Sequence, residues 1–291
     1  MVESMNELHL DSAPEQASVR PLTSDGWPEG YAYGATRHAD VILRQAFPER
    51  YADLASVLDS FQPTLDELRT GGGGRTVFVK RFDDSLAERG ASEGSRMWGK
   101  QNITIEKRVS IGSQEVALSR VRGHEIDMFG IGSIDNPLPG VAVEMEWNNK
   151  DPFFDRDLVN FQALHREGAI AVGVIVTRGP ELQELISPTI RSKDGGFKYG
   201  LSSTHWNKLV PRVNLGGGGE CPLLLIGIEP ARVVGIELAQ EVRREIEDAE
   251  IVRSNWRELY GEKGAAVAES RRLRDSALSR MPPLSPTSDT P

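Results

Sequence analysis

Three carboxylates lie close together in a part of the sequence whose other residues are largely apolar. Asp127 stands near the end of one predicted strand, and Glu144 and Glu146 lie two residues apart on the next. Side chains alternate along a strand, so the two glutamates face the same side of the predicted sheet, opposite Val143 and Met145. A short return between the two strands brings Asp127 beside this pair.

Carboxylates gathered in this way repel one another unless a divalent cation lies among them. Mg²⁺ suits such a site because it is a hard ion, held by one or two carboxylates together with water and phosphate oxygens. An ion held there lowers the pKa of a bound water and stabilises an in-line displacement at phosphorus. The alternative is that the glutamates face solvent, as on many antiparallel strands. Apolar flanks weaken this alternative, since buried strands seldom carry two unpaired acids, but the spacing alone leaves both readings open.

The elements that must position these carboxylates follow from hydrophobic periodicity. Helices are predicted at residues 36–46, 51–60, 155–168, 180–190, near 204–210, 237–262 and 265–280. Strands are predicted at residues 76–82, 103–121 (one or two strands around Gly112), 122–129, 141–147, 169–177 and 222–228. Apolar strands that alternate with helices predict an α/β fold with some parallel strands. The glycine runs at residues 71–74 and 216–219 predict flexible loops.

Length and composition bound the fold. The chain has 291 residues, of which 38% are hydrophobic and 26% charged, so it can bury a sizeable core. The pattern predicts a polar, loosely ordered start over residues 1–25 and a single domain over 26–280, whose C-terminal helices occupy about 237–280. Residues 281–291 hold four prolines and predict a disordered tail.

Charge and cysteine content exclude several classes of protein. The formal net charge of −9 argues against a generally cationic nucleic-acid binder, although a local basic face remains possible. Cys221 is the only cysteine, so no intrachain disulfide or cysteine-based zinc cluster can form. The run Gly71–Gly74 lacks the ending of a phosphate-binding loop, which argues against a nucleotide cofactor. The absence of a long apolar run and of a signal-peptide pattern at the N-terminus predicts a cytoplasmic protein without a membrane span.

Five stretches carry a family resemblance: GHEIDMFG (123–130), VEMEWNNKDPFFDRDLVNF (143–161), AVGVIVTRG (171–179), KYGLSSTHWNKLVPR (198–212) and GGGGECPLLLIGI (216–228). With them the chain resembles the BglII/BamHI-like type II restriction endonucleases of the PD-(D/E)xK superfamily. The resemblance implies a restriction-endonuclease-like core at about residues 75–230, with a mixed β-sheet flanked by helices. It also implies a homodimer that uses Mg²⁺ to cut both strands of double-stranded DNA at a palindromic site.

The resemblance assigns roles to the carboxylates. Asp127 and Glu144, with the backbone carbonyl of Met145, match the metal ligands of the family. Glu146 occupies a position that is usually lysine in the superfamily; it looks like the BamHI variant and differs from the glutamine of the BglII-like variant. Its role stays open between general base, second-metal ligand and water positioner. Lys150 shares the strand parity of the glutamates and is a candidate for the missing catalytic cation, or for a phosphate contact.

DNA contacts are expected on two segments. Asn149 follows the catalytic pair, where an asparagine can read adenine in the major groove; the alternative is an ordinary turn residue. Residues 185–219 carry five lysines and arginines against one aspartate, which suits phosphates, although solvated basic loops are also common. The predicted DNA contacts are Asn148, Asn149, Lys193, Lys198, Ser202, Ser203, Thr204, His205, Lys208 and Arg212. A structure-specific or repair nuclease and a non-catalytic DNA-binding protein are the alternative functions.

Overall fold

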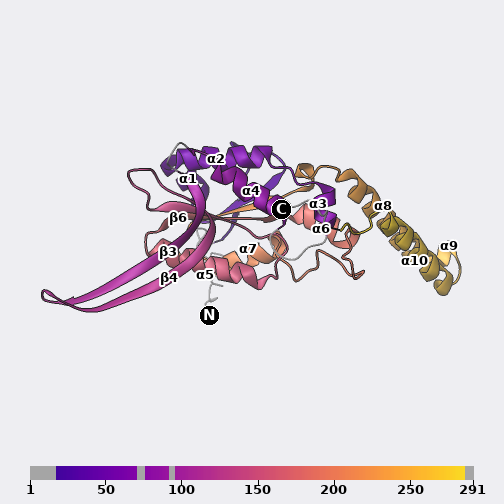
Figure 1. The fold of residues 1–291 in the computed structure, drawn as a ribbon. Coiled ribbons are helices and arrows are strands. Elements are labelled where there is room, and N and C mark those ends of the chain that lie inside the picture. Colours follow the sequence, from indigo (N-terminus) through magenta and orange to yellow (C-terminus); the bar gives the residue numbers. More distant parts are fainter. Residues whose placement is uncertain (1–17, 71–75, 92–95, 286–291) are drawn as a thin grey trace, which may run out of the picture.

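One mixed sheet organises the chain, whose computed structural model describes residues 18–70, 76–91 and 96–285 (Figure 1). The strand order is β1-β2-β7-β6-β5-β4-β3. The strands are β1 (Arg20–Pro21), β2 (Tyr31–Ala35), β3 (Trp98–Ile111), β4 (Gln114–Gly130), β5 (Gly140–Met145), β6 (Ile170–Arg178) and β7 (Leu223–Ile228). Strands β5, β6 and β7 run parallel, and the pairs toward both edges are antiparallel. The predicted α/β class with a mixed sheet is therefore confirmed.

Helices cover both faces of the sheet. They are α1 (Ala39–Ala46), α2 (Pro48–Ser60), α3 (Leu65–Arg69), α4 (Val77–Ala87), α5 (Pro152–Arg166), α6 (Pro180–Thr189), α7 (Trp206–Asn214), α8 (Glu237–Ser254), α9 (Trp256–Leu259) and α10 (Lys263–Ser279). One apolar cluster joins the sheet to α1, α2, α4 and α6, and a second joins its other face to α5 and α7. Helices α8 and α10 extend as an antiparallel pair to one side of the body (Figure 1).

The parallel strands β5, β6 and β7 form the rigid centre. Their residues are buried almost without interruption, as expected for strands covered by helices on both faces. Along β5, Val141 and Val143 pack into the first cluster and Ala142 into the second, so the predicted alternation is confirmed. Helix α5 connects β5 to β6 and ends just before Gly168, whose φ of 72° favours glycine. This crossover fixes the start of α5 beside the end of β5.

Two predicted elements were wrong. Residues 76–82 were expected to form a strand, but they belong to α4, whose buried Phe78, Phe82 and Leu86 recur with helical spacing. A seven-residue window that alternates is too short to distinguish the two periods. The long helix predicted at 237–262 is broken at Asn255 into α8 and α9.

Two segments predicted to be loose are ordered. The glycine run at 216–219 is a packed turn that closes α7: the Gly217 N–H donates to the Arg212 carbonyl (2.9 Å), and a Cβ on Gly217 would lie 2.9 Å from Leu158. At the C-terminus Met281 is buried and the Pro282 carbonyl accepts a hydrogen bond from Arg69 (2.8 Å), so the disorder predicted from residue 281 is wrong as far as 285. The run at 71–74, residues 1–17 and residues 286–291 lie outside the described residues.

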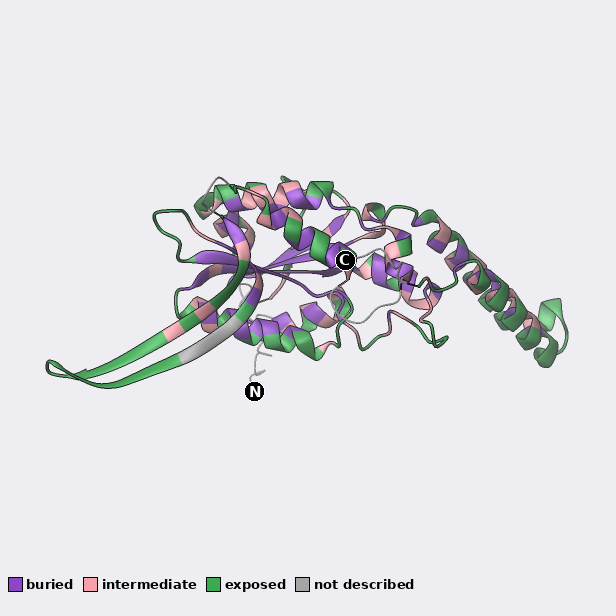
Figure 2. Ribbon diagram, in the orientation of Figure 1, coloured by how far each residue is buried: buried purple, intermediate pink, exposed green. Residues whose placement is uncertain are grey.

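Strands β3 and β4 form a long hairpin that extends beyond the sheet (Figure 2). The strands predicted around Gly112 are confirmed, but the predicted strand at 122–129 is the inner part of β4 rather than a separate element. The β3–β4 register shifts at three places, and each shift adds one residue to β4. Such bulges bend and twist a strand and often re-aim a side chain beside a functional site. Among the described residues, no helix is long and apolar enough to cross a membrane.

The packing of α5 on β6 generates a prediction. A Cβ on Gly173 of β6 would lie 2.4 Å from the ring of Phe161 on α5, so Gly173→Ala is expected to lower the free energy of unfolding by about 1–3 kcal/mol through overpacking. Gly99→Ala is the control, because nothing lies within 4 Å of its added Cβ. Urea unfolding of both variants measures the effect. Equal stabilities would contradict this account of the α5 contact.

Candidate active site

A polar cavity of about 540 Å³ opens where β5 ends, between α4, α5 and the inner end of the β3–β4 hairpin. Asp127, Glu144 and Glu146 all line it, so the three carboxylates singled out from the sequence share one cavity. Further polar residues in the lining are Lys100, Glu125, Asn148, Asn149, Arg156, Asp157, Asn160 and Lys198.

A bulge in β4 turns Asp127 toward Glu144. Ile126 pairs with Gln101 and Phe129 with Gly99, so three steps along β4 match two along β3. Ile126 and Phe129 consequently pack in the same apolar cluster although they are three positions apart along β4. Within the bulge the Asp127 N–H donates to Glu144 Oε1 (3.2 Å), which joins the two strands at the cavity.

Glu144 is buried among like charges. Its side chain is 4% exposed, and burial raises its pKa well above the ordinary value, with further increases from the charges of Asp127 and Asp157. The Asp127 N–H lowers the pKa but does not offset these effects. A carboxylate in such surroundings stays charged at neutral pH only when a cation approaches it.

Glu146 is held at both oxygens. Arg156 Nη2 donates to its Oε1 (3.2 Å), and Asn149 Nδ2 donates to its Oε2 (2.5 Å). Burial and the neighbouring charge of Asp157 raise the pKa of Glu146 to about 8, although Asn149 and Arg156 act in the opposite direction. The side chain therefore has a fixed orientation and a proton affinity near the neutral range.

Asp157 and Arg156 were not predicted from the sequence. Asp157 is 2% exposed, and its Oδ1 lies 2.7 Å from Arg156 Nη2, which thus bridges it to Glu146. Burial raises the pKa of Asp157. A signal was present: Asp157 continues the helical spacing of Phe154 and Phe161, which puts an acid in the buried stripe of α5.

The donors in the cavity fit a hard divalent cation. All its acidic side chains offer oxygen, and they outnumber the cations beside them. Glu146 is already bonded by Arg156 and Asn149, which leaves Asp127 and Glu144 as the pair open to an ion. In the described part of the chain no three acidic, histidine or cysteine side chains converge as a metal-binding group. An ion held by Asp127 and Glu144 would therefore need water or phosphate oxygens to complete its coordination.

Lys150 does not share the cavity with the glutamates. The parity argument fails because β5 ends at Met145, and residues 147–149 bend away from the strand. Lys150 is exposed and forms an isolated antiparallel bridge with Ser203 instead. The prediction that strand alternation places Lys150 beside Glu144 and Glu146 is therefore wrong.

Lys198 does line the cavity, but not as a free surface cation. Its Nζ donates to the carbonyls of Leu68 (2.7 Å) and Thr70 at the end of α3. Burial, together with the charge of Arg178, lowers its pKa to about 8. Asn148 and Asn149 also line the cavity, with the Asn149 amide turned toward Glu146.

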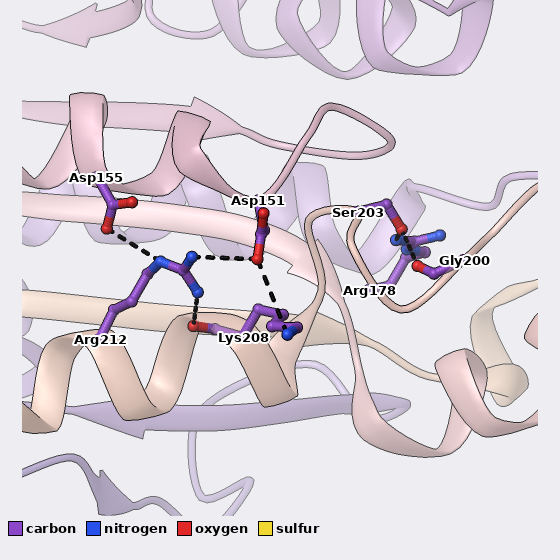
Figure 3. A network of polar contacts seen from close by, with 7 residues as sticks. All are labelled: Asp151, Asp155, Arg178, Gly200, Ser203, Lys208 and Arg212. Atoms are coloured by element: carbon purple, nitrogen blue, oxygen red, sulfur yellow. Dashed lines mark hydrogen bonds and ion pairs between the residues drawn. The ribbon is translucent and has the colours of Figure 1, made fainter.

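Part of the predicted basic surface is neutralised within the chain (Figure 3). Arg212 pairs with Asp155 (3.0 Å) and Asp151 (3.2 Å), and Lys208 Nζ lies 3.9 Å from Asp151. These contacts join α7 to the start of α5. Lys193 is exposed and outside this network.

Thr204 and His205 are buried, which corrects their predicted contact with DNA. Their exposed fractions are 0% and 3%, so neither side chain can reach a base edge in this conformation. Arg178 Nη2 donates to Ser203 Oγ (2.6 Å; both residues are drawn in Figure 3). It also donates to the Thr204 carbonyl (2.5 Å), and these bonds anchor the segment to β6. Burial lowers the pKa of His205 to about 4. Ser202 remains exposed.

Comparison with known proteins gives one family. Residues 31–228, more than half of the chain, match the family model described as restriction endonuclease BglII/BglIII. No curated protein is a significant match. The matched range includes the whole cavity and every strand from β2 to β7.

The buried acids make stability depend on pH. Because the pKa of Glu146 rises from 4.5 to about 8 on folding, the folded chain binds more protons over this range and loses stability as pH increases. The raised pKa of Glu144 acts in the same direction. We expect Glu144→Gln to increase the melting temperature more at about pH 8 than at about pH 5.

Thermal unfolding in the presence of a chelator measures this difference. Glu125→Gln is the control, since Glu125 is exposed beside Lys100 in the same cavity wall. A Glu144→Gln shift that is the same at both pH values would show that burial does not raise the pKa of this acid.

Proposed function

The chain belongs to the BglII/BglIII family of restriction endonucleases, and from this premise we propose that it makes Mg²⁺-dependent double-strand cuts at a specific short palindromic DNA site. It is a type II site-specific deoxyribonuclease, whose family acts on DNA with a divalent metal ion. The observation that supports the finer proposal is the gathering of Asp127, Glu144 and Glu146 in one polar cavity.

In this proposal Asp127 and Glu144 hold Mg²⁺, with the backbone carbonyl of Met145 as a further ligand. Mg²⁺ bound there supplies a water of lowered pKa and neutralises charge that develops on the phosphate. Glu146, in its ionised form, accepts the proton of the attacking water, since Arg156 and Asn149 hold its carboxylate in place. Lys150 has no assigned part in this chemistry, since it lies outside the cavity lining.

In this proposal each strand of the site is cut in a cavity of its own. The two strands of a palindromic site are related by a two-fold axis, so two copies of the chain related by the same axis each present one cavity to one strand. We therefore propose a two-fold homodimer on DNA. A chain that stays monomeric on DNA in sedimentation while it cuts both strands together would contradict this assembly.

The predicted DNA contacts fall into two groups in this proposal. Exposed Asn148 and Ser202 lie where short polar side chains can meet base edges. Phosphates are contacted by Lys193, Lys208 and Arg212. Lys208 and Arg212 first break their ion pairs with Asp151 and then bind the DNA backbone. Asn149 belongs to the catalytic group rather than to base reading, because its amide donor is already bonded to Glu146.

A digest of phage DNA tests the function. We expect discrete bands in Mg²⁺ and intact DNA in a chelator. A smear would instead indicate a nuclease without sequence choice, and intact DNA in both conditions would indicate a protein that binds without cutting.

The metal ligands generate a prediction. Asp127→Ala or Glu144→Ala should reduce cleavage by more than about 100-fold, since each removes a ligand of the ion on which water activation depends. Binding to DNA in Ca²⁺ should stay close to the wild-type value, because these side chains hold the ion and do not read bases. Single-turnover cleavage and filter binding measure the two effects.

Glu125→Gln is the matched control for these variants. Glu125 lies in the same wall of the cavity but is exposed and paired with Lys100, so its loss should change the rate little. If Glu125→Gln slowed cleavage as much as Asp127→Ala, general negative charge rather than coordination would explain the requirement for acids.

Asn149 and its neighbour Asn148 form a second pair of variants. Asn149→Ala should lower the single-turnover rate by roughly 10- to 100-fold, since it frees one oxygen of Glu146, while DNA affinity remains unchanged. Asn148→Ala should leave the rate intact and weaken discrimination between cognate and mismatched duplexes. The reverse pattern would identify Asn149 as the base-reading residue and remove it from the catalytic group.

A further inference from the structure

The outer part of the β3–β4 hairpin is exposed on both faces. Every residue from 106 to 120 is exposed (Figure 2). A two-stranded ribbon without a covering layer is only marginally stable in water, because it buries little apolar surface. This part of the fold therefore offers a large surface to a partner.

The two faces of the hairpin differ in chemistry. The three residues that the register shifts insert all lie in β4. The side chains of β3 therefore alternate between the two faces without interruption. One face of β3 carries Lys100, Asn102, Thr104, Glu106 and Arg108; we call it the polar face. The opposite face carries mainly apolar residues, namely Ile103, Ile105, Val109 and Ile111, with Gln101 and Lys107 among them. On β4, Arg120 stands opposite Glu106 and adds to the polar face, where Leu118, opposite Arg108, is an apolar exception.

The polar face begins at the candidate active site. Lys100 lines the cavity and pairs there with Glu125, two residues from Asp127. From Lys100 to Arg108 the strand covers about 26 Å, at roughly 3.3 Å per residue, which equals about eight base-pair steps of DNA. A duplex that places one phosphate in the cavity therefore has its neighbouring backbone within reach of this face.

Charge favours nucleic acid as the partner. Residues 99–120 contain four lysines and arginines against two glutamates, in a chain whose net charge is −9. Arg108 and Arg120 are 63% and 67% exposed, and both lie near Glu106, at 3.6 and 2.6 Å. Such exposed ion pairs contribute little in water, so a phosphate can replace Glu106 without a large cost.

We propose that the polar face of the hairpin binds the phosphate backbone of double-stranded DNA that flanks the cut site. The inference rests on the proposed function, and it adds a contact outside the cavity and the basic segment at 185–219. Arg108 and Arg120 are the phosphate contacts, and the curved hairpin carries them along the duplex away from the cavity.

Binding to duplexes of two lengths tests the proposal. The probes are random-sequence duplexes of about 12 and about 40 base pairs, and binding is measured in Ca²⁺ over a salt series. The polar face of the hairpin contacts DNA only on the longer duplex. The double variant Arg108→Gln, Arg120→Gln should reduce the slope of log K against log salt by about 2 on the longer duplex and leave the shorter one unchanged. Glu106→Gln should have the opposite effect and strengthen binding to the longer duplex, because it removes the carboxylate next to both arginines; Arg108 keeps its contact with Glu115 (3.7 Å).

The matched control removes the same charge elsewhere. Lys263 and Arg271 are exposed on α10, at the other end of the molecule (Figure 1), so Lys263→Gln, Arg271→Gln should keep the wild-type slope on both duplexes. Equal slopes for the hairpin and α10 variants would overturn the proposal, and so would wild-type binding that is independent of duplex length. Loss of a wild-type dimer by the hairpin variant in sedimentation would overturn it too and assign the face to a second copy of the chain.

The proposed function and the hairpin contact are tested by different measurements, so either one can fail without the other. Plasmid cleavage by the wild-type protein in Mg²⁺ tests the nuclease directly. If binding depends on duplex length but the protein does not cut DNA, the hairpin contact stands and the proposed nuclease function fails. If the protein cuts DNA but its binding does not depend on duplex length, the function stands and the hairpin contact fails.

Discussion

Repulsion among buried carboxylates is the constraint on which the rest of this structure depends. Two like charges about 4 Å apart repel by about 4 kcal/mol when the effective dielectric constant is about 20. Here Glu144, Glu146 and Asp157 are all nearly inaccessible to solvent and line one cavity with Asp127. Their compensation is partial: Arg156 bonds both Glu146 and Asp157, the Asn149 amide bonds Glu146, and the Asp127 N–H bonds Glu144. The fold must therefore supply rigidity from elsewhere, and the buried parallel strands β5, β6 and β7 supply it.

The same constraint accounts for how the surrounding cations are arranged. Lys100 pairs with Glu125, and Lys198 donates to backbone carbonyls of α3, so neither neutralises the acids at the bottom of the cavity directly. Fully buried Arg178 lies over the ring of Tyr199 (4.6 Å) and donates to the Thr204 carbonyl. It holds the segment between α6 and α7 against β6. The excess of acids is thus preserved where a divalent ion and a phosphate would meet.

Local patterns in the sequence were sufficient to predict which carboxylates on the strands face the same side of the sheet. Alternation alone predicted that Glu144 and Glu146 share a face; it holds one residue past the end of β5, where the Glu146 N–H still donates to the Val176 carbonyl of β6 (2.9 Å). The same rule failed for Lys150, because residues 147–149 bend away from the strand. Asp157 was missed for a different reason: its helical spacing puts it in the buried stripe of α5, but the strand residues that this stripe meets are decided by packing. Burial of Thr204 and His205 depends on Arg178, which is distant in sequence, so the polar composition of that loop misleadingly suggested an exposed surface.

Strand β4 connects the chemistry of the cavity with the surface outside it. Its inner bulge shifts the register by one residue, which allows Ile126 and Phe129 to remain in the core while Asp127 reaches Glu144. Without that extra residue, strict alternation would put Ile126 and Phe129 on opposite faces of the sheet. The two outer register shifts also fall on β4, so β3 carries an unbroken polar face from Lys100 to Arg108. Bulges confined to one strand thus aim a carboxylate inward and leave the other strand regular enough to present a continuous surface.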